Sequence, residues 1–154
     1  MTNDKLVKMT RIEDGYVLRL DPESIVEIAV VNDVTEVTYF ETPEETVTVE
    51  VFEDLYRICH CIASETEMYG ALSRSEFGGG HIKFRLNTEC VSPREITLPA
   101  YLVNRLRYDT DTNCVFVTVH SFVGAYATTY SVREDFIVAC AQVAYSLGYK
   151  GKAV

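Results

Sequence analysis

A short pattern typical of a helix start occurs twice in this 154-residue chain, and it limits the fold more than any other feature. Residues 51–62 read VFEDLYRICHCI, and residues 132–143 read VREDFIVACAQV. In each segment a Glu-Asp pair is followed by a large apolar residue and, four residues after that, by a cysteine. Two copies of one pattern predict the internal duplication of a smaller unit.

The repeat divides the chain into two predicted units, residues 1–77 and residues 78–154. A glycine-rich stretch at residues 75–80 (SEFGGG) lies at the midpoint and is interpreted as the linker between them. Units of about 75 residues are marginally stable alone, because a small domain buries a small share of its surface. We therefore predict one compact α+β body in which the two units pack about a pseudo-two-fold axis.

Alternation of apolar and polar residues predicts strands in both units. Asp14-Gly15 between two alternating segments is a hairpin signal, because glycine accepts the positive φ of the turn. Residues 25–31 (IVEIAVV) are ambiguous between a short helix and a buried strand. Residues 7–10 of the first unit are matched to residues 84–87 of the second. The segments predicted as strands are 5–12, 16–20, 34–40, 46–52, 81–87 and 114–119.

Each unit is predicted to close with a helix. The first spans about residues 53–73 and carries Leu55 on its apolar stripe. The second begins at Ser131, whose spacing to Glu134 is that of a capping box. Truncation of Leu55, or of Phe136 in the second helix, to Ala should cost about 2–5 kcal/mol by leaving a cavity.

The first unit also carries a pattern known from other proteins. Residues 7–28 read VKMTRIEDGYVLRLDPESIVEI, which is an opening hairpin followed by an Asp-Pro turn. Residues 50–55 read EVFEDL, a strand-to-helix junction. On this pattern, residues 5–63 resemble the FlbD family of small flagellum-associated proteins, and similar compact units occur in phage and plasmid proteins. The resemblance implies a non-enzymatic regulatory or interaction module.

Charge is divided unevenly along the chain, whose formal net charge is −9. The first unit holds 17 Asp and Glu against 6 Lys and Arg, whereas the second holds 6 against 8. The negative total disfavours non-specific binding to nucleic acid, because phosphates are repelled by an acidic surface. A negative face in the first unit would instead suit a basic partner.

The five cysteines are an odd number without a disulfide framework, which is typical of thiols in a reducing compartment. The first residues of the sequence show neither the basic nor the apolar region of a secretory signal. No apolar run approaches the roughly 20 residues of a membrane-spanning helix. We therefore expect a cytoplasmic protein that does not act at a membrane.

No catalytic motif stands out, so enzymatic activity is disfavoured and neither a metal nor another cofactor is expected. On a helix, the thiols of Cys59 and Cys61 would point about 200° apart, so both cannot bind one ion. The run Gly78-Gly79-Gly80 lacks the Lys and the Ser or Thr of a phosphate-binding loop. An enzyme would require His81 or His120 to meet a carboxylate in the folded chain.

The function we favour is a non-catalytic binding or regulatory protein that acts on a protein partner, for example a phage or mobile-element regulator or inhibitor. The partner would meet the acidic surface of the first unit or the tyrosines and arginines of the second, a composition typical of binding hot spots. The residues expected to contact the partner are Glu41, Glu44, Glu45, Tyr101 and Tyr108.

The alternative is a small anionic ligand, such as a nucleotide, or a nucleic acid, bound in the cleft between the units. Arginines would neutralise its phosphates, and tyrosines would stack on its bases. The residues expected to form this site are Arg94, Arg105, Arg107 and Tyr126. A homo-oligomer is the other assembly considered.

Overall fold

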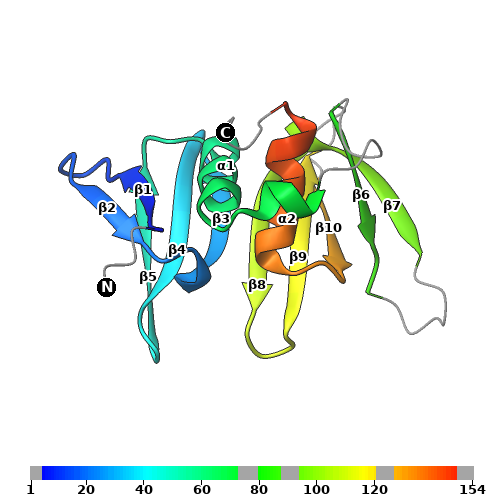
Figure 1. Cartoon of the computed structure of the whole chain (residues 1–154). Helices are drawn as coiled ribbons and strands as arrows, with labels where there is room; N and C mark the ends of the chain where they lie inside the picture. The colour runs from blue at the N-terminus through cyan, green and yellow to red at the C-terminus, as the bar shows by residue number, and fades with distance from the viewer. Residues whose placement is uncertain (1–4, 73–79, 88–93, 121–126, 149–154) are drawn as a thin grey trace.

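The computed structural model describes residues 5–72, 80–87, 94–120 and 127–148. These residues form antiparallel strands and two α-helices, so the predicted α+β class is confirmed. Figure 1 shows the two helices side by side in front of a broad sheet, with a small hairpin at each end. Neither helix in the described ranges has the length and apolarity needed to cross a membrane.

The two halves of the chain have the same order of element types up to their helices. The elements of the first half are β1 (Val7–Thr10), β2 (Val17–Leu20), the 3₁₀ turn η1 (Pro22–Ser24), β3 (Ile25–Val31), β4 (Val34–Thr42), β5 (Glu45–Val51), α1 (Leu55–Glu65) and the 3₁₀ turn η2 (Met68–Leu72). Those of the second half are β6 (His81–Arg85), β7 (Glu95–Pro99), the 3₁₀ turn η3 (Ala100–Leu102), β8 (Val103–Asp109), β9 (Cys114–His120), β10 (Ala127–Val132) and α2 (Phe136–Ser146).

The two halves meet in one six-stranded sheet with the strand order β10-β9-β8-β3-β4-β5. Its central pair is β3 and β8, one strand from each half, aligned antiparallel. These strands pair over three residues each, centred on Ile28 opposite Leu106, and both of these side chains are fully buried. The pairing ends there, so Ile25 on β3 and Tyr108 on β8 are not paired across the two halves.

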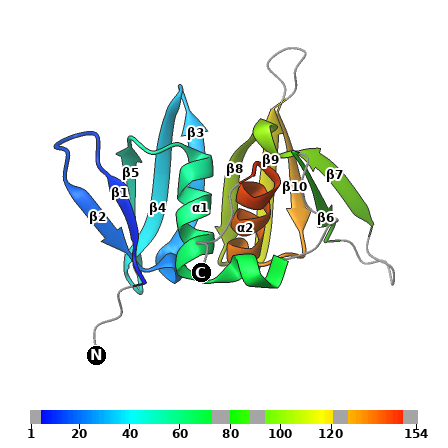
Figure 2. The ribbon, with the colours of Figure 1, turned by 45° about the horizontal axis from the view of Figure 1, so that its top comes forward.

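The helices α1 and α2 pack against each other over one face of the sheet (Figure 2). Leu55 and Ile62 of α1 and Val143 of α2 are fully buried. At the helix contact, the buried thiol of Cys59 meets that of Cys140. One cluster of buried side chains therefore includes residues of both halves.

The hairpin predicted at Asp14-Gly15 is present, because β1 and β2 pair antiparallel and Gly15 adopts a φ of +73°. The carboxylate of Asp14 accepts hydrogen bonds from the guanidinium of Arg11 at 2.9 and 2.6 Å and from the backbone N–H of Tyr16 at 3.1 Å. These hydrogen bonds lower the pKa of Asp14 to about 2, and the bond from Arg11 has the largest effect. The turn chemistry of this segment is therefore readable from its sequence.

The first helix is shorter than predicted, since α1 ends at Glu65 and not near residue 73. The hydroxyl of Thr66 donates to the carbonyl of Ile62 at 2.7 Å, which satisfies a carbonyl of the last turn. Glu67 then adopts a φ of +59°, and a right-handed helix cannot continue through that conformation. The 3₁₀ turn η2 follows this break.

The predicted capping box of the second helix is wrong. The N-cap of α2 is Asp135, and Ser131 lies inside β10. Glu134 does not turn back to a capping residue, because its carboxylate accepts a hydrogen bond from the backbone N–H of Arg85 at 3.1 Å. Residues 25–31, which were ambiguous, form the strand β3.

Each hairpin is joined to the start of its helix by an equivalent hydrogen bond. Thr10 donates its backbone N–H to Glu53 at 2.7 Å, and Arg85 donates to Glu134 in the same way. These bonds match Thr10 with Arg85, whereas the sequence match paired it with Asn87. The two alignments differ by two residues, which leaves every side chain on the same face of a strand, so apolar alternation does not distinguish them.

Candidate functional site: a pocket between the two halves

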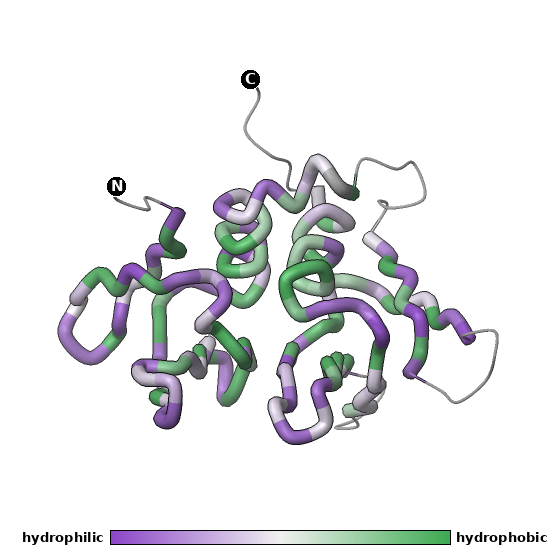
Figure 3. Tube along the Cα trace, turned by 60° about the horizontal axis from the view of Figure 1, so that its bottom comes forward, coloured by the Kyte–Doolittle hydropathy of each residue, from purple (hydrophilic) through white to green (hydrophobic). Residues whose placement is uncertain are grey.

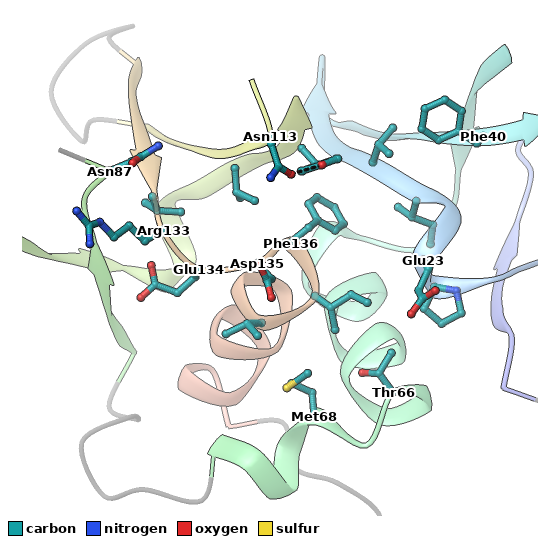
Figure 4. Close-up of a pocket in the computed structure, with 18 residues that line it drawn as sticks. Glu23, Phe40, Thr66, Met68, Asn87, Asn113, Arg133, Glu134, Asp135 and Phe136 are labelled. Carbon is teal, nitrogen blue, oxygen red and sulfur yellow. Dashed lines mark hydrogen bonds between the residues drawn. The ribbon is translucent and has the colours of Figure 1, made fainter. Parts of the chain in front are cut away.

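A pocket of about 870 Å³ opens where β3 and β8 separate. It lies at the end of the sheet that carries the β4–β5 and β8–β9 turns, which is the lower edge of Figure 1. Figure 4 shows that Glu23 of η1 lies on one side, and that Asp135 and Phe136 at the start of α2 lie on the other. The volume is within the range of small-ligand sites.

Somewhat more than half of the pocket's lining is apolar, and this lining comes from both halves. Its apolar residues include Ile25, Val26 and Phe40 from the first half, and Val115, Phe136 and Ile137 from the second. Because neither half supplies the whole wall, the pocket requires the two halves to be packed together.

The rim of the pocket carries two exposed carboxylates, those of Glu23 and Asp135. Asp135 is the N-cap of α2 but makes no side-chain capping hydrogen bond, whereas Asp54 at the same place on α1 accepts one from the N–H of Arg57 at 2.7 Å. The positive end of the helix dipole favours a carboxylate there. Arg133 also lines the pocket and adds one positive charge.

Glu134 lines the pocket as well, but its carboxylate already has partners. It is 7% exposed, and it accepts hydrogen bonds from the backbone N–H of Arg85 at 3.1 and 3.2 Å and from its Nε at 3.3 Å. This residue therefore holds the β6–β7 hairpin to α2 and is not counted among the groups that could bind a ligand.

The predicted partner-binding tyrosines lie at opposite ends of β8. Tyr108 lines the pocket, and its hydroxyl donates to the side-chain oxygen of Asn113, another pocket residue. Tyr101 lies on η3, before the first residue of β8, and is 48% exposed. Only Tyr108 is therefore placed at the pocket.

The predicted acidic residues Glu41, Glu44 and Glu45 are exposed at the β4–β5 turn. Glu41, near the end of β4, directly follows Phe40, which lines the pocket. Figure 3 brings this end of the molecule forward and shows hydrophilic residues along both the β4–β5 and the β8–β9 turns. The acidic turn and Tyr108 thus lie at the same end of the sheet.

The arginines predicted for an anionic ligand are not part of this pocket. Arg105 and Arg107 flank the buried Leu106 on β8, so strand alternation places them on the face of the sheet away from the helices. Arg105 forms an ion pair of 3.3 Å with Glu27, and the guanidinium of Arg107 lies 4.9 Å from the ring centre of Phe116. Arg94 precedes β7, and residue 126, the predicted Tyr126, is outside the described residues.

The histidines do not share a structural element. His81 begins β6 of the two-stranded β6–β7 sheet, whereas His120 ends β9 of the six-stranded sheet. On α1, His60 shares a hydrogen bond of 2.8 Å with the hydroxyl of Tyr69, and burial lowers the pKa of His60. Across the described ranges, no three His, Cys, Asp or Glu side chains are grouped so that they could hold a metal ion.

Sequence reasoning missed Glu23, Asp135 and Ile137 as pocket residues. Glu23 was expected only in a turn, and Asp135 only in a helix start. One difference between the two copies of the helix pattern could have pointed to the pocket. Tyr56 in the first copy corresponds to the smaller Ile137 in the second. Glu23, Asp135 and Ile137 line the pocket only because the two halves pack together.

Comparison with known proteins finds no matching family model, no matching curated protein and no matching solved structure.

Proposed function

We propose that this chain is a non-catalytic binding protein that regulates or inhibits a protein partner, and that the partner inserts an apolar side chain into the pocket between the halves. The observation that carries the proposal is the 870 Å³ pocket with an apolar wall and two carboxylates at its rim. A pocket of this kind anchors a few side chains of a partner while charges around it select the partner.

The charges around the pocket favour a basic partner. Glu23 and Asp135 lie at the rim, and Arg133 offsets one of these charges. The β4–β5 turn beside the pocket adds the exposed acidic residues Glu41, Glu44 and Glu45. Such a surface raises the association rate of a positively charged partner and does so less at high salt.

We also infer that the two halves are copies of one ancestral unit related by a pseudo-two-fold axis between β3 and β8. Equivalent hydrogen bonds from Thr10 to Glu53 and from Arg85 to Glu134 support this inference. So does the order of the elements, which is the same in both halves up to the helix. A duplicated binding unit of this kind agrees with the interaction role that the resemblance of residues 5–63 to the FlbD family implies.

A titration with short peptides tests the proposed function. The probes are blocked pentapeptides with Leu, Phe or Tyr at the centre, flanked on both sides by two Lys or by two Glu. Methyl resonances of Val115, Val132 and Ile137 report on the pocket wall. We expect at least one basic peptide to shift these resonances and the acidic peptides to leave them unchanged. Equal shifts with both charge types, or no shift with any peptide, would refute the proposal.

A matched pair of variants separates the acidic turn from net charge. The triple variant Glu41→Lys, Glu44→Lys, Glu45→Lys should weaken binding of the basic peptides several-fold at low salt. The control is Glu13→Lys, Glu50→Lys, Glu95→Lys, which changes the net charge equally at exposed residues that do not line the pocket. The control should bind more tightly than the first variant.

A second candidate function uses the face of the sheet away from the helices. Arg107 lies over Phe116 there, and an arginine with an aromatic ring is a common platform for single-stranded nucleic acid. If this face binds nucleic acid, an oligonucleotide should bind with a steep salt dependence, and Arg107→Ala should reduce both affinity and salt slope. A flat salt response would count against it.

We also propose that the protein is located in the cytoplasm. The described cysteines, Cys59, Cys61, Cys114 and Cys140, are all free thiols, and two of them touch at the helix contact. Neighbouring thiols are typical of a reducing compartment. Cell fractionation followed by alkylation of free thiols tests the location directly.

A further inference from the structure

We propose that the pocket binds a phenol group, carried by a tyrosine of a basic partner segment, in the way that the chain's own Tyr56 is bound at the other end of the helix pair. This inference rests on the proposed function and specifies its ligand. It follows from a comparison of the first turns of α1 and α2.

Tyr56 is the second residue of α1, and its hydroxyl joins the helix to the neighbouring half. The hydroxyl donates to the carbonyl of Tyr101 at 2.6 Å and lies 3.2 Å from the carbonyl of Val103. Tyr101 is the second residue of η3, and Val103 is the first residue of β8. A tyrosine therefore spans the space between a helix start and the junction of a 3₁₀ turn with a central strand.

The equivalent junction in the first half lies between η1 and β3, and it faces the start of α2 across the pocket. The second residue of α2 is not a tyrosine. That residue of α2 is Ile137, which follows Glu134-Asp135 as Tyr56 follows Glu53-Asp54. The counterparts of Tyr101 and Val103 are Glu23, the second residue of η1, and Ile25, the first residue of β3. Ile137, Glu23 and Ile25 all line the pocket. The open space thus lies where α1 places a phenol ring.

The surroundings suit a phenol more than a purely apolar group. Ile25, Phe136 and Ile137 offer an apolar wall for the ring. The backbone carbonyls of Glu23 and Ile25 correspond to those that accept from Tyr56. Because a carbonyl oxygen has two lone pairs, each can accept a hydrogen bond in addition to one it already has. Tyrosine also supplies a large rigid contact at low entropic cost. Lysines or arginines beside it would meet the carboxylates of Glu23 and Asp135 at the rim.

The central test compares three blocked peptides, Lys-Lys-X-Lys-Lys with X as Tyr, Phe or Ala, by titration against the full chain. The phenol inference predicts that the Tyr peptide binds about threefold to tenfold more tightly than the Phe peptide, which is the usual net effect of one hydrogen bond. The Ala peptide should bind most weakly. Equal affinities for Tyr and Phe would overturn the phenol inference while leaving the proposed function intact, and absence of binding by all three would overturn both.

The variant Ile137→Tyr supplies the ring from within the chain. It should reduce binding of the Tyr peptide at least tenfold, because its own ring would occupy the pocket. We expect no loss in melting temperature, because the new hydroxyl can donate to the carbonyls of Glu23 or Ile25. The control is Ile12→Tyr, at an exposed residue that does not line the pocket, and it should bind the Tyr peptide as the wild type does. Undiminished binding by a folded Ile137→Tyr variant would overturn the inference. If that variant does not fold, the Tyr and Phe comparison on the wild-type chain decides.

Tyramine distinguishes the source of the phenol, since it carries a phenol and an ammonium group but no peptide. We expect it to shift the methyl resonances of Val115 and Ile137 only at much higher concentration than the Tyr peptide does. Tyramine binding as tightly as the peptide would overturn the partner-segment form of the inference and assign the pocket to a small phenolic amine.

Discussion

The carboxylate of Glu134 accepts hydrogen bonds from the backbone N–H of Arg85 at 3.1 and 3.2 Å across 49 residues of sequence. Glu134 directly precedes the N-cap of α2, and Arg85 is the last residue of β6. One buried carboxylate thus fixes a hairpin to a helix, and Glu53 does the same for Thr10 at 2.7 Å in the first half.

Replacement of Glu134 by Ala should destabilise the fold by about 1–3 kcal/mol, because the backbone N–H of Arg85 would lose its acceptor in a part-buried place. Glu134→Gln keeps a side-chain oxygen that can accept this bond and should cost less. Urea denaturation measures both values, with the exposed Glu44→Ala as the control. Equal, small effects for Ala, Gln and the control would show that the carboxylate is dispensable.

The buried apolar residues at the helix starts should matter more than exposed ones of similar size. Leu55 is fully buried and Phe136 is 8% exposed, so truncation of either to Ala should cost about 2–5 kcal/mol. Phe52 is 66% exposed and provides a matched aromatic control, for which Phe52→Ala should change stability by less than about 0.5 kcal/mol. Thermal and urea denaturation of the three variants would test this order, and a Phe52→Ala loss as large as that of Phe136→Ala would contradict it.

The sequence was informative wherever a local interaction decides the structure. The hairpin at Gly15 was predicted because the turn needs a positive φ, and the start of α1 because Glu53-Asp54 precede an apolar stripe. The end of α1 was missed because its break depends on Thr66 and Glu67, neither of which is a usual helix-stop residue. Local signals therefore gave the element types better than their ends.

The residues that line the pocket could not be predicted from the sequence, because they are far apart along the chain. Ile25 and Ile137 line the same space, although more than 100 residues separate them. Glu134 was read as a capping residue since Ser131 has the right spacing, but the tertiary bond to Arg85 determines its position. A cleft between the halves was predicted as the site of an anionic ligand, whereas the rim carboxylates Glu23 and Asp135 were not predicted.

The cysteines should differ strongly in their reaction with iodoacetamide. Burial, followed by the contact with Cys140, raises the pKa of Cys59 well above its usual range, so the reactive thiolate is scarce. Cys140 is buried at the same contact, whereas Cys114 is only partly buried. In the folded protein at pH 8, peptide mass mapping should find Cys114 labelled well before Cys59 and Cys140. Labelling of Cys59 at the rate of Cys114 would mean that the helix contact opens readily.

Tyr56 should make stability depend on pH in the alkaline range. Burial raises the pKa of Tyr56 from 10.0 to about 12, so its phenol keeps its proton in the folded chain at a pH where an unfolded tyrosine has lost it. Between about pH 10 and pH 12 the folded state therefore binds more protons than the unfolded state, and stability falls as the pH rises.

The variant Tyr56→Phe isolates this effect. At pH 7 it should be less stable by about 1 kcal/mol, because the hydroxyl no longer donates to the carbonyl of Tyr101. As the pH rises from 10 to 12, the wild type loses stability because the hydroxyl of Tyr56 keeps its proton only in the folded chain. The variant has no hydroxyl at this position and does not lose stability in this way, so the difference between the two should shrink. Urea denaturation at intervals from pH 7 to pH 12 measures the gap, with Tyr16→Phe, whose residue is 58% exposed, as the control. A gap that stays constant to pH 12 would show that the phenol of Tyr56 is not held in its protonated form by the fold.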